Sequence, residues 1–341
     1  MDAIRILGAG PAGSAAAIAA LSESAAVRLF EKSTFPHHKV CGEFLSPGAS
    51  RILEALGVWQ DFLGLGPARI RRFVLHLGLR AKHWTLPECA FGLSRYEFDR
   101  LLFDRAVLLG AEVDREPGAC QRLVREPESD GGAPIVIATG RSAMARRGHR
   151  LFGFKAHFEG PADDAVELFF FEDCYVGVSA VENGITNVCG IAPESTLRRH
   201  NFQMDELLDR WRPLGDRLGP LTRSMRWLTT GPLVFSRGGY DRPQPAIYPA
   251  GDALGFVDPF TGSGMLNALL TGRMAGIAAA RHVSGRTYVR QCARVLEAPL
   301  RMAALFRTAL RWGWVGPLAP FLPGSWLFRL TRAAEADLSW P

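Results

Sequence analysis

The chain is poor in three features that would restrict its fold or its location. Its six cysteines include no Cys-x-x-Cys pair or other metal-binding spacing, and a chain of 341 residues does not depend on disulfides. The longest uncharged stretch near the C-terminus, residues 312–328, contains three prolines and is too short to cross a bilayer as a helix. An apolar strand pattern begins at residue 4, so we expect no signal peptide. These absences predict a reduced, cytoplasmic protein without a metal site.

Lysine is also scarce, since Lys32, Lys39, Lys82 and Lys155 are the only lysines among 40 basic residues. The formal net charge is +6, but the arginines are dispersed and no nucleic-acid motif accompanies them. We therefore predict no nucleic-acid partner. The dispersed arginines are interpreted as solvated surface, with attraction to an anionic membrane or a phosphorylated cofactor as the alternative. The composition, 48% hydrophobic and 22% charged, is typical of a globular protein with a large core.

The first 31 residues carry the most informative pattern. An apolar run over 4–7 leads into Gly8-Ala9-Gly10-Pro11-Ala12-Gly13, an alanine-rich stretch follows, and a second apolar run ends at Glu31. This is the order strand, glycine turn, helix, strand, acid, which is typical of dinucleotide-binding βαβ units. The sequence predicts that this segment binds the ADP half of a dinucleotide.

Each residue of this pattern has an expected role. Gly8 allows the tight turn, Gly10 lets the backbone approach a pyrophosphate, and Gly13 lets the helix pack closely on the strand. The helix N-terminus offers free N–H groups to the phosphates. The Glu31 carboxylate is placed to accept hydrogen bonds from ribose hydroxyls.

A second glycine-containing segment lies between residues 246 and 280. Gly251-Asp252 follows an apolar run, at the end of an expected buried strand, where ligands gather in open α/β sheets. A glycine loop over 261–264 then opens an expected helix, whose first N–H groups favour negative charge on a ligand.

Gly251-Asp252, followed by Asp258-Pro259-Phe260-Thr261-Gly262-Ser263-Gly264, resembles the second flavin fingerprint of the para-hydroxybenzoate hydroxylase-like flavoproteins. This superfamily includes aromatic hydroxylases, geranylgeranyl reductases and flavin-dependent halogenases. The resemblance implies FAD as cofactor, with Asp252 on the ribityl chain and Pro259 against the isoalloxazine. It also implies an α/β fold: an FAD-binding, Rossmann-like domain of the glutathione-reductase type, an inserted, mainly antiparallel β substrate domain, and a helical C-terminus.

Three further segments match the superfamily in order. Residues 35–47 resemble the Lys-x-Cys-Gly loop of the geranylgeranyl reductase-like branch, here Lys39-Val40-Cys41-Gly42. Residues 94–102 resemble its Arg-x-x-Phe-Asp helix, which implies that Arg95 approaches the flavin phosphate and ribityl region. At 135–141, Thr139 stands where many members carry the aspartate of a Gly-Ala-Asp-Gly turn. This replacement argues against direct use of NADPH and favours a separate flavin reductase, while NAD(P)H remains the alternative electron donor.

The two fingerprints and the resemblance together assign a set of residues to FAD. We expect cofactor contacts from Gly8, Gly10, Pro11, Ala12, Gly13, Glu31, Lys32, Cys41, Gly42, Arg95, Gly140, Gly251, Asp252, Pro259, Gly262, Ser263, Gly264 and Met265.

Between the fingerprints, short β-rich runs bounded by Gly, Asp and Asn predict antiparallel strands. We expect strands over 73–77, 165–171, 175–179 and 186–191, and a helix over 205–211. These elements would form a substrate domain whose sheet covers the flavin. The expected FAD-binding domain comprises residues 1–68, 94–146 and 239–286, the substrate domain residues 69–93 and 147–238, and a helical C-terminal cover residues 287–341.

Two family patterns are altered or missing. The prenyl reductases carry Tyr-x-Trp-x-Phe-Pro in the substrate domain; this chain keeps Tyr175, but Gly177 replaces the tryptophan and Ser179-Ala180 replace Phe-Pro. The Trp-x-Trp-x-Ile-Pro motif of the halogenases does not precede Gly251. The first departure argues against an isoprenoid reductase, and the second against a halogenase.

The catalytic candidates are Cys41, Lys39 and Tyr175, each with an ordinary alternative. The Cys41 thiol is either activated by Lys39, His37 or His38, or is a small loop residue packed against the flavin ring. Tyr175 is either a site residue or a half-buried strand tyrosine. Glu43 is interpreted as an acid that steers protons or as a helix-start acid. His37 and His38 are expected to be exposed loop residues without a carboxylate partner.

The first interpretation of the function is an FAD-dependent monooxygenase that hydroxylates a small hydrophobic molecule of secondary metabolism, aromatic or polyketide- or lipid-like. The alternative is reduction or dehydrogenation of carbon–carbon bonds in an isoprenoid or lipid-like substrate, which the Lys-x-Cys-Gly loop favours. A flavin-dependent halogenase and a non-catalytic flavoprotein are the remaining hypotheses.

The C-terminal segment adds a hypothesis about partners. Residues 296–329 are rich in Leu, Phe and Trp with interspersed arginines. They are interpreted either as an amphipathic cover that touches a membrane surface or gates a lipid-like substrate, or as a helix that closes the substrate domain.

Overall fold

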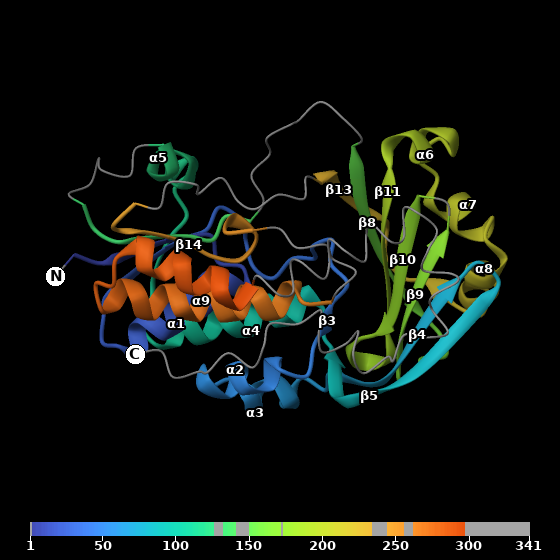
Figure 1. Ribbon diagram of the computed structural model, residues 1–341, viewed down its shortest axis with the longest axis horizontal. Helices are drawn as coiled ribbons and strands as arrows, with labels where there is room; N and C mark the ends of the chain where they lie inside the picture. Colours follow the sequence, from blue (N-terminus) through green and yellow to red (C-terminus); the bar gives the residue numbers. More distant parts are fainter. Residues whose placement is uncertain are drawn as a thin grey trace.

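The chain folds around two β-sheets that lie side by side, one wrapped by long helices and the other forming the opposite end of the molecule (Figure 1). The computed structural model describes residues 2–125, 132–140, 150–171, 173–233, 244–255 and 262–296. One sheet is parallel and the other almost wholly antiparallel, so the expected α/β fold class is confirmed.

The parallel sheet has five strands in the order β14-β7-β1-β2-β6. Their bounds are β1 Ile4–Leu7, β2 Val27–Phe30, β6 Glu112–Asp114, β7 Ile135–Ile137 and β14 Ile247–Pro249. Successive side chains point to opposite faces. Ile6, Leu29 and Val136 belong to the core cluster that contains residues of the long helices, whereas Leu7 and Phe30 pack with the short helix α5 (Ala119–Arg125).

Three long helices lie together beside the parallel sheet (Figure 1). They are α1 (Pro11–Ser22), α4 (Arg95–Leu108) and α9 (Gly264–Ala280). The backbones of α1 and α9 meet directly: a Cβ built at Gly272 would lie 2.1 Å from the Ala12 carbonyl oxygen, and one at Gly276 would lie 2.2 Å from that of Ala16. Only glycine permits this approach, so α1 and α9 form one rigid layer.

The second sheet has nine strands, in the order β12-β8-β11-β10-β9-β4-β5-β3, with β13 paired to β8. Only the β4–β9 pair is parallel among its described pairings. The strands are β3 Phe44–Leu45, β4 Ala68–Leu77, β5 Arg80–Gly92, β8 Leu151–Glu159, β9 Ala165–Phe171, β10 Cys174–Ala180, β11 Thr186–Pro193, β12 Thr222–Arg223 and β13 Leu228–Leu233. The four strands expected within this region are confirmed.

Alternation along β8 gives the nine-stranded sheet two different faces. Phe154, Ala156 and Phe158 pack under α6 (Glu194–Arg199), α7 (Met204–Asp209) and α8 (Arg212–Leu218). The intervening Lys155 and His157 therefore point to the other face, toward the parallel-sheet unit. The helix expected over 205–211 corresponds to α7, which ends two residues earlier because α8 begins at Arg212.

The remaining described elements are short, apart from a helical segment over 285–296. They are α2 (Ala49–Ala55), α3 (Trp59–Gly64), η1 (Glu182–Gly184) and η2 (Gly251–Ala253). Most of the expected cover over 287–341, including the proline-interrupted stretch 312–328, lies outside the described residues, so its contact with a membrane stays a prediction. In the part of the chain that the structure describes, no helix is long and apolar enough to cross a membrane.

Replacing Gly276 tests the contact between α1 and α9. In Gly276→Ala the new methyl group meets the Ala16 carbonyl, so we expect the free energy of unfolding to fall by about 2 kcal/mol, as in other overpacked cores. The matched control is Gly64→Ala in α3, where nothing lies within 4 Å of the new methyl group. The control should be neutral or slightly more stable. Equal stabilities of the two variants in urea unfolding would contradict the close approach.

Candidate active site

A large cavity among the described residues joins the carboxyl edge of the parallel sheet to the open face of the nine-stranded sheet. Its volume is about 1040 Å³, and at one end it is lined by both glycine turns. At the other end its wall consists of side chains from β4, β9, β10 and β11, among them Leu75, Leu168, Phe170 and Ile191. The cavity has room for a dinucleotide and for part of a second molecule.

Most residues that the sequence assigns to FAD meet in this cavity. Its wall contains Gly8, Gly10, Pro11, Ala12, Glu31, Lys32, Cys41, Gly42, Arg95, Gly140, Gly251, Asp252, Gly262, Gly264 and Met265. Gly13 and Ser263 are buried behind the wall. Pro259 lies outside the described residues.

The first glycine turn has the geometry expected from its spacing. Gly8 has a φ of +97°, and a Cβ there would lie 2.5 Å from the Ala138 carbonyl oxygen. A Cβ on Gly13 would lie 1.7 Å from the Gly8 carbonyl oxygen, so this glycine is needed for α1 to pack on the turn. The space above Gly10 is open. A Cβ built at Gly10 would lie 3.8 Å from the Arg95 guanidinium and 3.9 Å from the Lys39 ammonium. The backbone at Gly10 can therefore be approached by a ligand.

The Glu31 carboxylate lies beside this turn and also organises it. Its Oε2 accepts a hydrogen bond from the Ala9 amide (3.0 Å), and its Oε1 accepts one from the Ser33 amide (2.7 Å). Carboxylate oxygens have several lone pairs, so these bonds leave acceptor capacity toward the cavity. The contact of Glu31 with ribose hydroxyls stays a prediction.

Two cations face the first turn across the cavity. The Arg95 guanidinium donates to both oxygens of buried Asp99, at 2.5 and 2.7 Å, and the Lys39 ammonium lies 3.6 Å from Asp99. Burial would lower the pKa of Arg95, but the Asp99 charge and its hydrogen bonds outweigh this and raise it. Burial, followed by the Arg95 charge, lowers the pKa of Lys39. This pair supplies positive charge where a pyrophosphate on the α1 N-terminus would lie.

The second glycine turn is fixed to the first. Gly251 has a φ of +59°, and its amide donates to the Thr271 hydroxyl of α9 at 2.9 Å. A Cβ on Gly251 would lie 3.0 Å from the Ala12 side chain, so the two turns touch. Nothing lies within 4 Å of a Cβ built at Gly264, where α9 begins. Two open backbones, two cations and a carboxylate along one cavity fit a dinucleotide such as FAD.

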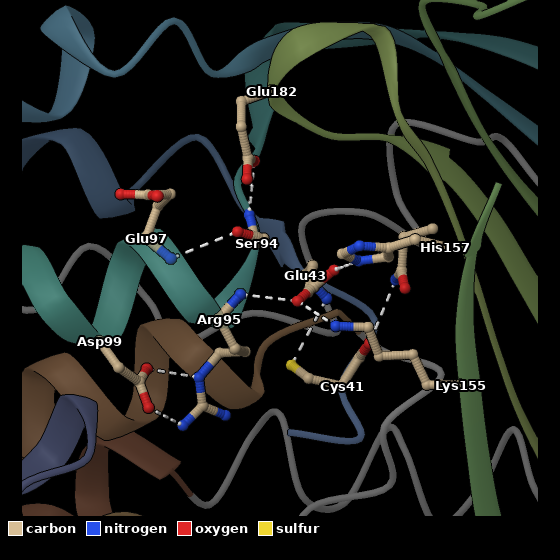
Figure 2. Close-up of polar contacts among 10 residues, drawn as sticks. Cys41, Glu43, Ser94, Arg95, Glu97, Asp99, Lys155, His157 and Glu182 are labelled. Atoms are coloured by element: carbon tan, nitrogen blue, oxygen red, sulfur yellow. Dashed lines mark hydrogen bonds and ion pairs between the residues drawn. The ribbon is translucent and has the colours of Figure 1, made fainter. Parts of the chain in front are cut away.

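A buried cluster of charged residues lies beside the cavity, with Glu43 at its centre (Figure 2). The Glu43 carboxylate accepts hydrogen bonds from the Arg95 amide (2.6 Å), the Lys155 ammonium and the His157 ring Nε2 (2.7 Å). Burial would raise the pKa of Glu43, but the bonds from His157 and Lys155 and their charges lower it. Glu43 is therefore an ionised carboxylate inside the protein.

The same carboxylate helps to fix the start of α4. Glu43 binds the Arg95 amide, and buried Glu182 binds the Ser94 amide at 2.8 Å, while the Ser94 hydroxyl accepts from the Glu97 amide at 3.3 Å (Figure 2). Negative charge at a helix N-terminus complements the helix dipole. The two carboxylates thus hold in place the helix turn from which the Arg95 side chain reaches the cavity.

The three catalytic candidates all line the cavity, but on different walls. The Cys41 Sγ accepts a hydrogen bond from the Glu43 amide (3.4 Å), and the Cys41 carbonyl accepts one from the Asn187 side chain (3.1 Å). Lys39 lies with Arg95 near the first glycine turn, whereas Tyr175 is on β10, in the sheet wall. Their catalytic roles stay predictions.

Two expectations about this region need correction. Glu43 does not begin a helix of its own, because its φ of 55° places it in the loop before β3, but its carboxylate does bind the first amide of another helix, α4. His38 does have a carboxylate partner in reach: its ring nitrogen lies within 4.8 Å of a Glu43 carboxylate oxygen and of the His157 ring nitrogen. Sequence reasoning missed Lys155 and His157 altogether. The available signal was two polar residues alternating with Phe154, Ala156 and Phe158 on one strand.

Comparison with known proteins identifies the family. The chain is 31% identical over 313 residues to digeranylgeranylglycerophospholipid reductase 1 of Methanopyrus kandleri. The alignment covers 80% of this chain and 78% of that protein. It belongs to the geranylgeranyl reductase-like branch of the FAD-dependent, para-hydroxybenzoate hydroxylase-like oxidoreductases. This flavoprotein is also 26% identical over 324 residues to menaquinone reductase of Mycobacterium tuberculosis, across 79% of this chain and 74% of that one.

The fold is shared more widely than the sequence. A flavin-dependent brominase superposes with a TM-score of 0.75 over 96% of this chain and 92% of its own, at 17% identity. No family model matches the chain. The FAD-dependent oxidoreductase family is thus settled, whereas the fold alone does not distinguish a reductase from a halogenase.

Removing the Glu43 charge tests the buried cluster in this flavoprotein. In Glu43→Gln the Lys155 ammonium stays buried without its counter-ion, so we expect a loss of roughly 3–5 kcal/mol in unfolding free energy at pH 7. Because the pKa of Glu43 is lowered in the folded protein, its contribution is complete above the unfolded carboxyl pKa of about 4.3 and is lost as the pH falls through the folded value. The difference between the two proteins should therefore shrink in acid.

The control for this measurement is Glu88→Gln, which removes an exposed carboxylate from β5. Its effect in denaturant unfolding should stay within about 0.5 kcal/mol. A Glu43→Gln protein as stable as this control at pH 7 would show that Lys155 does not depend on the carboxylate.

Proposed function

We propose that the protein reduces carbon–carbon double bonds in a long apolar, lipid-like substrate with FAD as its cofactor. The observation that carries the proposal is the continuous cavity from the glycine turns to the apolar face of the nine-stranded sheet. The names of two relatives, a digeranylgeranylglycerophospholipid reductase and a menaquinone reductase, support the same reaction class. When bound, FAD supplies the transfer of electrons between a donor and the substrate.

The protein's own residues position the two molecules. Arg95 and Lys39 would hold the phosphates near the α1 N-terminus, and the amides at the start of α9 would stabilise negative charge on the flavin. Leu75, Leu168 and Ile191 would offer an apolar wall to the substrate. The electron donor is NAD(P)H or a separate flavin reductase; Thr139, on the cavity wall, favours the second.

Hydroxylation of a hydrophobic substrate, the first interpretation of the sequence, is the second candidate. It is favoured by one feature of the sheet wall: Gly177 and Ser179 line the cavity where the prenyl reductase pattern places large aromatic and apolar residues. A smaller wall leaves space for a bulkier, ring-shaped substrate.

Blocking the first glycine turn tests whether FAD binds in this cavity. A Cβ at Gly10 has no contact closer than 3.8 Å, so Gly10→Val should fold with a melting temperature near that of the native protein. Its isopropyl group would occupy the path of the pyrophosphate, and we expect at least tenfold weaker FAD binding, measured by flavin fluorescence titration. A yellow Gly10→Val preparation with native FAD content would place the cofactor elsewhere.

Turnover without oxygen separates the two reactions. The purified holoenzyme is reduced with dithionite under nitrogen and mixed with geranylgeraniol or menaquinone in detergent, and flavin reoxidation is followed by absorbance at 450 nm. A reductase should reoxidise with these acceptors and form saturated product, detected by mass spectrometry. Reoxidation and product formation that occur only after oxygen is admitted would instead favour hydroxylation.

A further inference from the structure

His38 is the only histidine among the described residues that line the cavity. Its ring meets the His157 ring edge to face, with centroids 5.2 Å apart, and lies 5.0 Å from the Tyr96 ring. The His38 ring nitrogen, a Glu43 carboxylate oxygen and the His157 ring nitrogen all lie within 4.8 Å of one another. Such separations are short enough for one bridging water molecule.

Behind His38, Glu43 and His157 form a buried carboxylate–histidine pair. An ionised carboxylate can only accept hydrogen bonds, so the His157 Nε2 at 2.7 Å carries the hydrogen. A carboxylate in this position fixes the tautomer and the orientation of the ring, as in the Asp–His pairs of hydrolases. The His157 ring is therefore held in place against the His38 ring.

Both candidate reactions consume one proton. Reduction of a C=C bond by NAD(P)H adds two hydrogens to the substrate: one carries the electron pair of the nicotinamide hydride, and the other enters as a proton. Hydroxylation of a C–H bond by O2 and NAD(P)H forms an alcohol, water and NAD(P)+, and it also takes up one proton. A titratable group on the cavity wall can deliver this proton to the reacting atoms as a general acid.

We propose that His38 passes this proton into the cavity and that the Glu43–His157 pair holds the His38 ring in position. The proposal rests on the proposed function only in that FAD occupies the cavity, and it does not depend on which substrate is reduced or hydroxylated. His38 is the group that faces the reactants, whereas Glu43 and His157 act as positioning residues.

The surrounding charges suit this role. His38 is faced by Lys155 and His157 of β8, by Glu43 of the same loop and by Glu182 of η1. Loss of water contact, then Lys155 and His157, lowers the pKa of His38, and the two carboxylates partly oppose them. A neutral imidazole results at neutral pH, which can accept a proton on one ring nitrogen while it releases one from the other.

His38, Glu43 and His157 carry donor atoms suited to a metal ion, but the neighbouring Lys155 argues against a metal site. The Lys155 ammonium already forms an ion pair with the Glu43 carboxylate. A divalent cation on that carboxylate would be repelled by the fixed positive charge in a poorly solvated region.

The first test compares two adjacent histidines in the holoenzyme. His38→Gln keeps a polar side chain but removes the titrating ring; His37→Gln is the control, because the His37 ring contacts the Thr34 carbonyl instead (3.1 Å). The probe is reoxidation of the photoreduced protein by dissolved oxygen. In this reaction O2 gains two electrons and two protons and leaves as hydrogen peroxide. One proton would come from the reduced flavin and the other from the protein.

We expect His38→Gln to slow this reoxidation about 100-fold and to flatten its pH dependence between pH 5 and 7. Added imidazole should restore much of the rate, which it would not do if His38 had only a structural role. His37→Gln should behave as the native protein does. A His38→Gln protein with native rate and native pH profile would overturn the proposal.

The second test needs no FAD, so it separates this inference from the proposed function. The His38 ring is titrated by NMR in the cofactor-free protein, where we expect a pKa below the ordinary value of about 6.5. His157→Gln should raise it, because the His157 charge is one of its causes. A His38 pKa at the ordinary value, unchanged in His157→Gln, would refute the coupling. Failure of the proposed function would appear instead as a protein that binds no FAD.

Discussion

The buried Glu43 carboxylate is the interaction on which the arrangement of the site depends. A charge inside a protein is tolerated only when hydrogen bonds and opposite charges replace its lost water. Glu43 obtains these from the first amide of α4 and from Lys155 and His157 of β8, so two separate elements meet on it. Satisfying one carboxylate therefore fixes how the loop that carries Cys41, the helix that carries Arg95 and the face of β8 meet around the cavity.

The two sheets contribute different chemistry to this meeting point. The parallel sheet and its helices supply backbone amides and cations that suit phosphates, and the nine-stranded sheet supplies an apolar wall. The cavity crosses from one to the other, so a cofactor held by the first presents its reacting end to a substrate held by the second. The fold is shared with a flavin-dependent brominase, and the sequence with a lipid reductase, so the fold by itself does not set the reaction. Reaction type must then be decided by individual wall residues, such as Gly177 and Ser179.

The sequence predicts well what depends on local backbone geometry. The glycine turns at Gly8–Gly13 and Gly251 follow from spacing, because positive φ angles and close helix packing leave no alternative residue, and alternating strands follow from a period of two. The Glu43 cluster could not be predicted, because Lys155 and His157 lie more than a hundred positions from Glu43 and their meeting depends on which face of β8 covers the cavity. Lys155 in particular is a charge in the apolar middle of a strand, and its partner is visible only after folding.

The contact between α1 and α9 has a consequence for how the protein handles its ligands. Each helix begins at one of the glycine loops, and Gly272 and Gly276 bring the two backbones together along much of their length. The two glycine turns are thus held at a fixed distance from each other, so a cofactor that spans them would meet a binding surface already formed before it arrives.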